Sequence, residues 1–224
     1  MTLHRGIRGV IFDLDGTLVE SAGEIASALN LVLADYDRAP LPLKEVEALI
    51  GRGVRVLMER ALRIARVPGS ELEGAIHKFE TAYAANVGTE AALFPGARMA
   101  LVELERAGLA RAVVTNKPRF FTERLLDRLG VADLFTAVVA GDDGIRRKPA
   151  GDMLMAAARA MDCDIDSCLM VGDSDNDVQA ARAAGCLVWC VPYGYNEGRP
   201  AEELACDRLV ETLPDIARLL TTDL

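Results

Sequence analysis

From about residue 109, short apolar runs alternate along the chain with segments of helical periodicity. The apolar runs cover 112–114, 137–140, 168–171 and 186–191. Runs of this length separated by helices predict parallel β-α units, because neighbouring parallel strands need a helical crossover. Each run ends in polar residues, and ligands of open α/β sheets bind beyond the carboxyl ends of the strands. The sequence therefore predicts an α/β protein with a Rossmann-like parallel sheet and a binding site at one edge of it.

Residues 21–89 differ from the rest of the chain, since they carry helical patterning and no convincing strand. The three predicted helices cover 24–34, 54–65 and a segment opened by a Ser-x-x-Glu capping box at Ser70. This stretch follows a first apolar strand, Val10-Ile11-Phe12, and precedes the remaining ones. We therefore expect an all-helical cap domain at 21–89, inserted into a core domain formed by 1–20 and 90–224.

Composition and charge narrow the classes of function. No apolar run in the 224 residues approaches the roughly 18 residues of a membrane span. The net charge of −9 disfavours a nucleic-acid binder, which needs a basic surface. The N-terminus does not resemble a signal peptide, and the five cysteines include no Cys-x-x-Cys pair. We expect a cytoplasmic protein with reduced thiols, a monomer or homodimer that binds neither nucleic acid nor membrane.

Four polar clusters follow four of the predicted strands. They are Asp13 with Asp15, Thr115 with Asn116, Lys148, and Asp173 with Asp177. Two carboxylates about 4 Å apart repel by roughly 4 kcal/mol at an effective dielectric of about 20, so such a cluster needs a proton or a divalent cation. Magnesium prefers hard oxygen ligands and binds through one or two carboxylates plus a phosphate. The clusters therefore predict Mg²⁺ and a phosphoryl group at one site.

Asp13 and Asp15 stand two residues apart at the end of the first strand, so their side chains share a face. A carboxylate nucleophile divides the hydrolysis of a phosphate ester into two steps through an aspartyl-phosphate. A second acid can protonate the leaving alkoxide and then activate water. An isolated Asp-Gly pair favours a simple turn, but this one follows an apolar strand and is accompanied by Asp13 and Thr17. The full DLDGT stretch therefore favours catalysis.

Lys148 and the pair Thr115-Asn116 each have two interpretations. Lys148 belongs to a basic run that could be solvated, or it could neutralise the nucleophile and the phosphate, which is the role we predict. Thr115 and Asn116 could simply end a strand, or they could offer a hydroxyl and a backbone N–H to phosphate oxygens.

With these residues the chain resembles the haloacid dehalogenase superfamily of phosphatases over essentially its whole length. The four motifs of that superfamily appear in order as DLDGT at 13–17, VVTN at 113–116, Lys148 before Pro149, and GDSDND at 172–177. The resemblance implies that Asp13 is the nucleophile and a metal ligand, and that Asp15 is the general acid and base and lends its backbone carbonyl to Mg²⁺. It also implies that Asp173 and Asp177 complete the metal site. Thr115, Asn116 and Lys148 would hold the phosphate.

Further stretches resemble the phosphoglycolate phosphatase subgroup. They are GRGVRVLMERAL at 51–62, LFPGA at 93–97, VVTNKP at 113–118, GDD at 141–143, QAARAAG at 179–185 and YGYN at 193–196. This resemblance implies a small phosphorylated metabolite as substrate, with 2-phosphoglycolate hydrolysed to glycolate and phosphate. A related phosphatase for a sugar phosphate, a nucleotide or pyrophosphate is the alternative. A phosphomutase and a non-catalytic regulatory module on the same fold are more distant ones.

The Gly51-Arg52-Gly53 stretch lies between two helices of the predicted cap. It is either a plain connector or a substrate loop lowered over the active site. In the second case Gly53 lies in that loop, and Arg52 or Arg55 grips the substrate carboxylate through a charge-assisted hydrogen bond.

Overall fold

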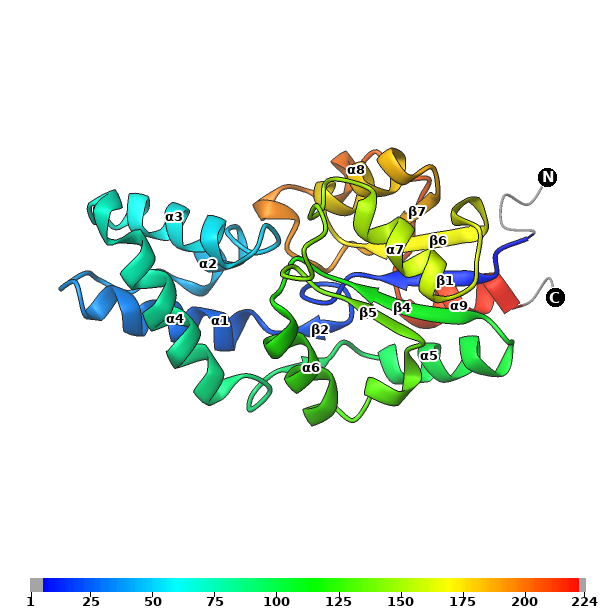
Figure 1. The fold of residues 1–224 in the computed structure, drawn as a ribbon, viewed down its shortest axis with the longest axis horizontal. Coiled ribbons are helices and arrows are strands. Elements are labelled where there is room, and N and C mark those ends of the chain that lie inside the picture. The colour runs from blue at the N-terminus through cyan, green and yellow to red at the C-terminus, as the bar shows by residue number, and fades with distance from the viewer. Residues whose placement is uncertain (1–5, 222–224) are drawn as a thin grey trace.

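The computed structural model of the protein describes residues 6–221, with a six-stranded parallel sheet at its centre (Figure 1). The strands are β1 (Gly9–Phe12), β4 (Ala110–Val114), β5 (Ala137–Val139), β6 (Cys168–Gly172), β7 (Leu187–Cys190) and β8 (Arg208–Leu209). Their order in the sheet is β5-β4-β1-β6-β7-β8. The chain therefore builds outward from β1 on one side and then crosses to the other, which makes the β1/β6 boundary the switch point where ligands of such sheets bind. The predicted α/β fold is confirmed.

Helices cover both faces of the sheet. They are α5 (Ala97–Arg106), α6 (Arg119–Arg128) and α9 (Leu213–Thr221) in one apolar cluster, and α7 (Asp152–Ala160) and α8 (Asp175–Ala184) in the other. In Figure 1, α5 lies below the sheet and α8 lies above it. Side-chain alternation along β1 explains the two layers, because Val10 and Phe12 join the first cluster and Ile11 joins the second.

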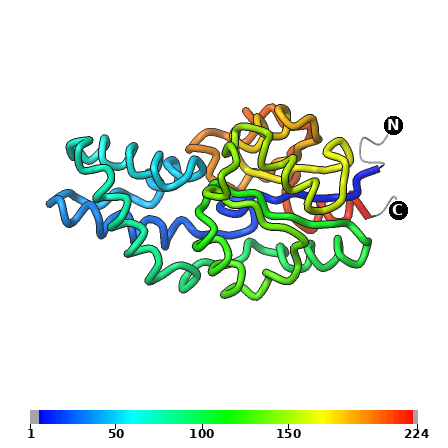
Figure 2. The backbone as a smooth tube through the Cα atoms, in the orientation of Figure 1, coloured from blue at the N-terminus to red at the C-terminus, as the bar shows by residue number. Residues whose placement is uncertain are grey.

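A group of helices, here called the helical insert, projects from one end of the sheet (Figure 1). Its members are α1 (Ala22–Ala34), α2 (Leu43–Glu47), α3 (Val54–Ile64) and α4 (Leu72–Asn86). The chain enters through β2 (Val19–Glu20) and leaves through β3 (Ala92–Leu93), and these two short strands pair antiparallel. Figure 2 traces the chain out along the insert and back. The chain thus enters and leaves the helical insert at the same place, beside β1.

Buried Glu24 ties the exit of the helical insert to its entry. It lies in the first turn of α1 and is 1% exposed. Its carboxylate accepts hydrogen bonds from the backbone N–H groups of Gly88 at 2.8 Å, Glu90 at 2.7 Å and Ala91 at 3.0 Å. These bonds satisfy a charge that would otherwise be costly to bury.

Within residues 6–221, every helix is too short or too polar to cross a membrane.

The predicted capping box at Ser70 is wrong. Ser70 lies inside a 3-10 turn, Gly69–Glu71, because the Glu71 N–H already bonds to the Pro68 carbonyl at 3.0 Å. The helix then begins at Leu72 without a side-chain cap.

Other 3-10 turns cover Ala132–Leu134, Ile165–Ser167, Asn196–Gly198 and Ala201–Glu203. The sequence did not predict α2, α5, α9, β2, β3 or β8, of which β2, β3 and β8 have only two residues each.

Candidate active site

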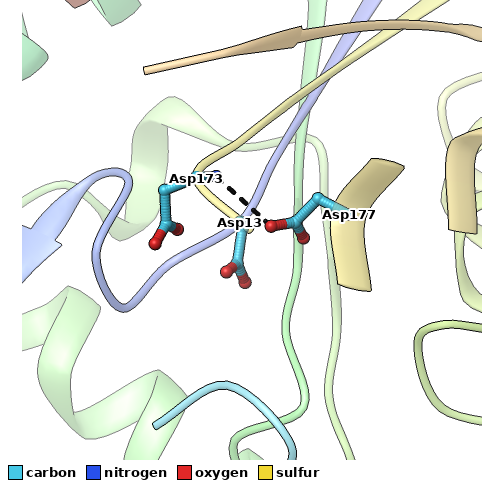
Figure 3. A group of neighbouring side chains, drawn as sticks. All are labelled: Asp13, Asp173 and Asp177. Atoms are coloured by element: carbon cyan, nitrogen blue, oxygen red, sulfur yellow. Dashed lines mark hydrogen bonds between the residues drawn. The ribbon is translucent and has the colours of Figure 1, made fainter. Parts of the chain in front are cut away.

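Three buried carboxylates meet where β1 and β6 end. Asp13 directly follows β1, and its N–H donates to the Val171 carbonyl at 2.9 Å, which extends the pairing with β6. Asp173 directly follows β6, and Asp177 lies in the first turn of α8. Each offers a carboxylate oxygen, and these oxygens lie within 4.8 Å of one another (Figure 3). We call Asp13, Asp173 and Asp177 the carboxylate trio.

Lys148 is the cation of this cluster. Its Nζ lies 2.7 Å from Asp13 Oδ1 and 2.7 Å from Asp177 Oδ1, and its side chain is 2% exposed. Three carboxylates and one ammonium leave two negative charges without a partner. Burial holds the pKa of Asp13 well above its ordinary value, although Lys148 opposes the shift. Burial and the charge of Asp177 likewise raise the pKa of Asp173 to about 6. A divalent cation would balance these charges, so the donor set fits one.

Neighbouring donors also hold the carboxylates of Asp173 and Asp177. Thr17 Oγ1 donates to Asp173 Oδ1 at 2.7 Å, and the Tyr195 N–H donates to Asp173 Oδ2 at 2.8 Å. Asp177 Oδ2 accepts from the Ser174 N–H at 3.1 Å and from Ser174 Oγ at 2.8 Å, forming the capping box of α8. It also accepts from the Asp173 N–H at 3.3 Å (Figure 3). These bonds fix the carboxylates before any ligand enters, which lowers the cost of binding.

Asp15 lies beside the carboxylate trio with a different set of partners. Both of its oxygens accept from Lys117 Nζ at 2.8 Å, and Oδ1 also accepts from Ser21 Oγ at 2.6 Å. The two aspartates of the DLDGT stretch therefore have separate environments. Lys117 was not among the predicted site residues, although it stands in the VVTNKP stretch directly after Thr115 and Asn116, which were. Its position directly after those two residues was the sequence feature from which a place in the site could have been predicted.

Thr115 and Asn116 extend the end of β4 toward the trio. The Thr115 N–H donates to the Val139 carbonyl at 3.0 Å, which continues the sheet. Asn116 Nδ2 donates to the Gly51 carbonyl at 2.9 Å and to the Lys148 carbonyl at 3.0 Å. Asn116 therefore joins the helical insert to the core. Its buried Oδ1 has no hydrogen-bond partner among residues 6–221.

A cavity of about 50 Å³ lies between the sheet edge and the helical insert. Its polar side, which we call the floor, is formed by Asp13, Asp15, Thr115, Asn116 and Lys117. Its other side, the roof, comes mainly from the insert and is lined by Ile25, Ile50, Gly51, Gly53, Val54, Leu57, Phe79 and Tyr83, with Pro118 and Phe121 from the core. The cavity is thus polar along the sheet edge and mostly apolar along the helical insert.

Arg52 and Arg55 point to other partners. Arg52 Nε pairs with Glu197, and Arg55 pairs with Glu73 at 2.6 Å. Neither arginine lines the cavity, whereas Gly53 does. Their contact with substrate stays a prediction.

The fold and the buried carboxylates define a hydrolase class. The family model for haloacid dehalogenase-like hydrolases matches residues 7–185. The chain belongs to the haloacid dehalogenase-like hydrolase family, and the resemblance seen in the motifs is confirmed.

Individual relatives are similar along almost the whole chain. A phosphoglycolate phosphatase of Nitrosospira multiformis is 40% identical over 217 residues, which cover 96% of each protein. The crystal structure of a predicted phosphoglycolate phosphatase from Haemophilus somnus has a TM-score of 0.91 at 30% identity, covering 96% of this chain and 98% of that one. The structure of CbbY from Rhodobacter sphaeroides in complex with phosphate has a TM-score of 0.79 at 26% identity, covering 94% and 96%.

Proposed function

We propose that the protein is a Mg²⁺-dependent phosphatase that hydrolyses 2-phosphoglycolate to glycolate and phosphate. The observation that carries the reaction is the carboxylate trio with Lys148, buried at the sheet edge beside a small cavity. The substrate rests on relatives such as the 40%-identical phosphoglycolate phosphatase. A small cavity also suits a small metabolite better than a nucleotide.

In the first step, a carboxylate oxygen of Asp13 attacks phosphorus and the ester P–O bond breaks. Asp15 gives a proton to the departing glycolate oxygen, so that no alkoxide is released. Lys148, 2.7 Å from Asp13 Oδ1, orients the nucleophile and attracts the phosphate oxygens. Thr115 and Asn116, which line the same floor, bind those oxygens through the hydroxyl and the backbone N–H.

In the second step, Asp15 takes a proton from a water molecule, which attacks the phosphorus of the aspartyl-phosphate. The bond between phosphorus and Asp13 breaks, and inorganic phosphate leaves with Asp13 restored. The same residue thus acts as acid and then as base. The Ser21 hydroxyl and the Lys117 ammonium hold the Asp15 carboxylate in place for both transfers.

The carboxylate trio and the backbone carbonyl of Asp15 would hold the Mg²⁺ ion. When bound, the ion would offset the charge that collects on the phosphoryl group. The uncompensated charge of the trio and the raised pKa of Asp13 and Asp173 support this assignment.

The helical insert supplies most of the roof, which supports a division of the chain into two parts. We assign a cap domain to 21–89 and a core domain to 1–20 and 90–224. The cap excludes water from the cavity during the reaction. We place the enzyme in the cytoplasm as a monomer or homodimer.

The substrate can be tested with purified protein and Mg²⁺. Phosphate release is measured from 2-phosphoglycolate, a sugar phosphate, a nucleotide and pyrophosphate. We expect the highest kcat/KM for 2-phosphoglycolate and none of this activity after Asp13→Asn. Preference for another compound on this panel would refute the substrate, and an isomerised product without free phosphate would identify a mutase.

A further inference from the structure

A substrate that carries a carboxylate needs a cation inside the cavity. The roof of the cavity is mostly apolar, and burying an unpaired charge against it would cost free energy. Arg52 and Arg55 pair with glutamates and do not line the cavity. Lys148 is held between two members of the carboxylate trio. Among residues 6–221, Lys117 is the one cation that lines the cavity.

Lys117 lies on the turn between β4 and α6, directly after Thr115 and Asn116. Its Nζ is 2.8 Å from both oxygens of Asp15 and 4.9 Å from the centre of the Tyr83 ring. An ammonium has three N–H donors, and two are directed at Asp15. The third donor has no carboxylate partner among residues 6–221 and only the neutral Tyr83 side chain beside it, so it can turn to a ligand carboxylate.

Tyr83 adds a second polar group on the roof. Its ring packs against Phe79 and Phe121 at centroid distances of 5.6 and 4.9 Å. Its hydroxyl is buried, and among residues 6–221 its proton has no acceptor, because the polar group beside it, the Lys117 ammonium, is itself a donor. Burial raises the pKa of Tyr83 to about 12, so the hydroxyl keeps its proton and can donate. An unused donor at this depth indicates a place for a ligand acceptor.

The length of the substrate places its carboxylate near these groups. The ester oxygen of 2-phosphoglycolate must contact Asp15 to receive a proton. Only one CH₂ group separates that oxygen from the carboxylate. Since Lys117 contacts Asp15 at 2.8 Å, the carboxylate comes within reach of its ammonium.

We propose that Lys117 and the Tyr83 hydroxyl bind the substrate carboxylate and select small acidic phosphate esters. This inference rests on the proposed function. Lys117 thus has two functions. It orients the Asp15 carboxylate, and it forms an ion pair with the carboxylate of the substrate. Specificity is then set at the boundary of core and insert rather than by Arg52 or Arg55.

The test compares 2-phosphoglycolate with 2-hydroxyethyl phosphate, in which an alcohol replaces the carboxylate. For Lys117→Met the ratio of the two kcat/KM values should fall roughly 10- to 100-fold, as expected for one charge-assisted hydrogen bond. Most of the change should appear in the KM for 2-phosphoglycolate. For Tyr83→Phe, which keeps the ring packing, the ratio should fall by a smaller factor.

Lys78→Met is a matched control. Lys78 Nζ lies 2.8 Å from Asp35 and 4.9 Å from the centre of the Tyr36 ring, the same pair of contacts on the outside of the insert. This variant should leave the ratio unchanged.

Two outcomes separate the inference from the proposed function. If Lys117→Met lowers activity equally on both substrates, Lys117 serves Asp15 alone and the inference is overturned. If that variant does not fold, an unchanged ratio in Tyr83→Phe overturns the inference instead. A wild-type enzyme that does not hydrolyse 2-phosphoglycolate overturns the proposed function as well.

Discussion

The floor and the roof of the cavity are built on different physical principles. On the floor, Asp13, Asp15 and Lys117 are ionisable and held by hydrogen bonds at 2.6 to 2.8 Å. On the roof, the insert presents apolar side chains and directs its arginines to glutamates outside the cavity. We therefore assign the chemistry to the floor, and the roof offers few polar groups for substrate selection.

This difference has an energetic side. Burial raises the pKa of Asp13 and Asp173, and the neighbouring carboxylates of the trio add to the shift, which means that the metal-free fold bears a cost at neutral pH. The roof holds no buried charge of this kind, because the side chains that line it are mostly apolar. Changes on the floor should therefore affect catalysis strongly, and changes at the edge of the roof should affect binding more weakly.

The largest effect is expected at the centre of the floor. Asp13→Asn removes the proposed nucleophile, so kcat should fall by roughly 10⁴-fold or more. The melting temperature without metal should not fall, since a buried charge is removed. Asp175→Asn is the control, because that side chain bonds outward to Gln179. Full turnover by Asp13→Asn in a preparation free of wild type would contradict the assignment.

The next largest effect is expected for Lys148→Met, as a loss of folding stability. It leaves Asp13 and Asp177 without their cation, and breaking a buried ion pair costs about 3–5 kcal/mol. Urea unfolding without Mg²⁺ should show this loss, and Mg²⁺ should restore part of it. Arg146→Met, at an exposed pair with Asp152, should cost at most about 1 kcal/mol. Equal losses of unfolding free energy in the two variants would show that Lys148 does not balance the charge of the carboxylate trio.

The stabilisation by Mg²⁺ should depend on pH. The folded-state pKa of Asp173 is about 6, above its unfolded value, so protonation favours the metal-free fold as pH falls through 6. At pH 7.5 the ionised trio binds the ion and loses its repulsion, whereas at pH 5 protons compete with it. The rise in melting temperature on adding Mg²⁺ should therefore be larger at pH 7.5. An equal rise at both pH values would mean that the ion binds elsewhere.

The smallest effect is expected where the roof meets the core. Glu197 pairs with Arg52 and lies 3.5 Å from Arg60, both in the insert. Glu197→Gln weakens this contact and should raise KM a few-fold for charged and uncharged substrates alike, with kcat little changed. Glu73→Gln, at an exposed pair with Arg55, should change neither constant. A large fall in kcat for Glu197→Gln would place Glu197 within the chemistry.

The two sides of the cavity also differ in how far the sequence predicts them. Asp13 and Asp173 were predictable because each directly follows an apolar strand, and parallel strands bring such positions to one edge. The capping pattern at Ser70 failed because Pro68 and Gly69 first form a turn. Which insert side chains line the roof depends on how helices rotate and pack, and no short pattern encodes that.

Lys117 illustrates the same limit on the floor. Its position after β4 is readable, but its contacts depend on Asp15 and Tyr83, which lie 102 and 34 positions away along the chain. Only the assembled sheet and insert bring these groups together. A lone lysine in the sequence gives no sign of such a partner.

The most direct test of the central claim is to trap the covalent intermediate. Rapid quenching of the wild-type enzyme during turnover of 2-phosphoglycolate should capture the phosphoenzyme before the second step releases the phosphate. Borohydride reduces an acyl phosphate to an alcohol, which would convert residue 13 to homoserine, and peptide mass spectrometry locates the change. The account predicts homoserine at position 13 alone, dependent on substrate and Mg²⁺. A trapped group at any other residue, or none during continued turnover, would contradict it.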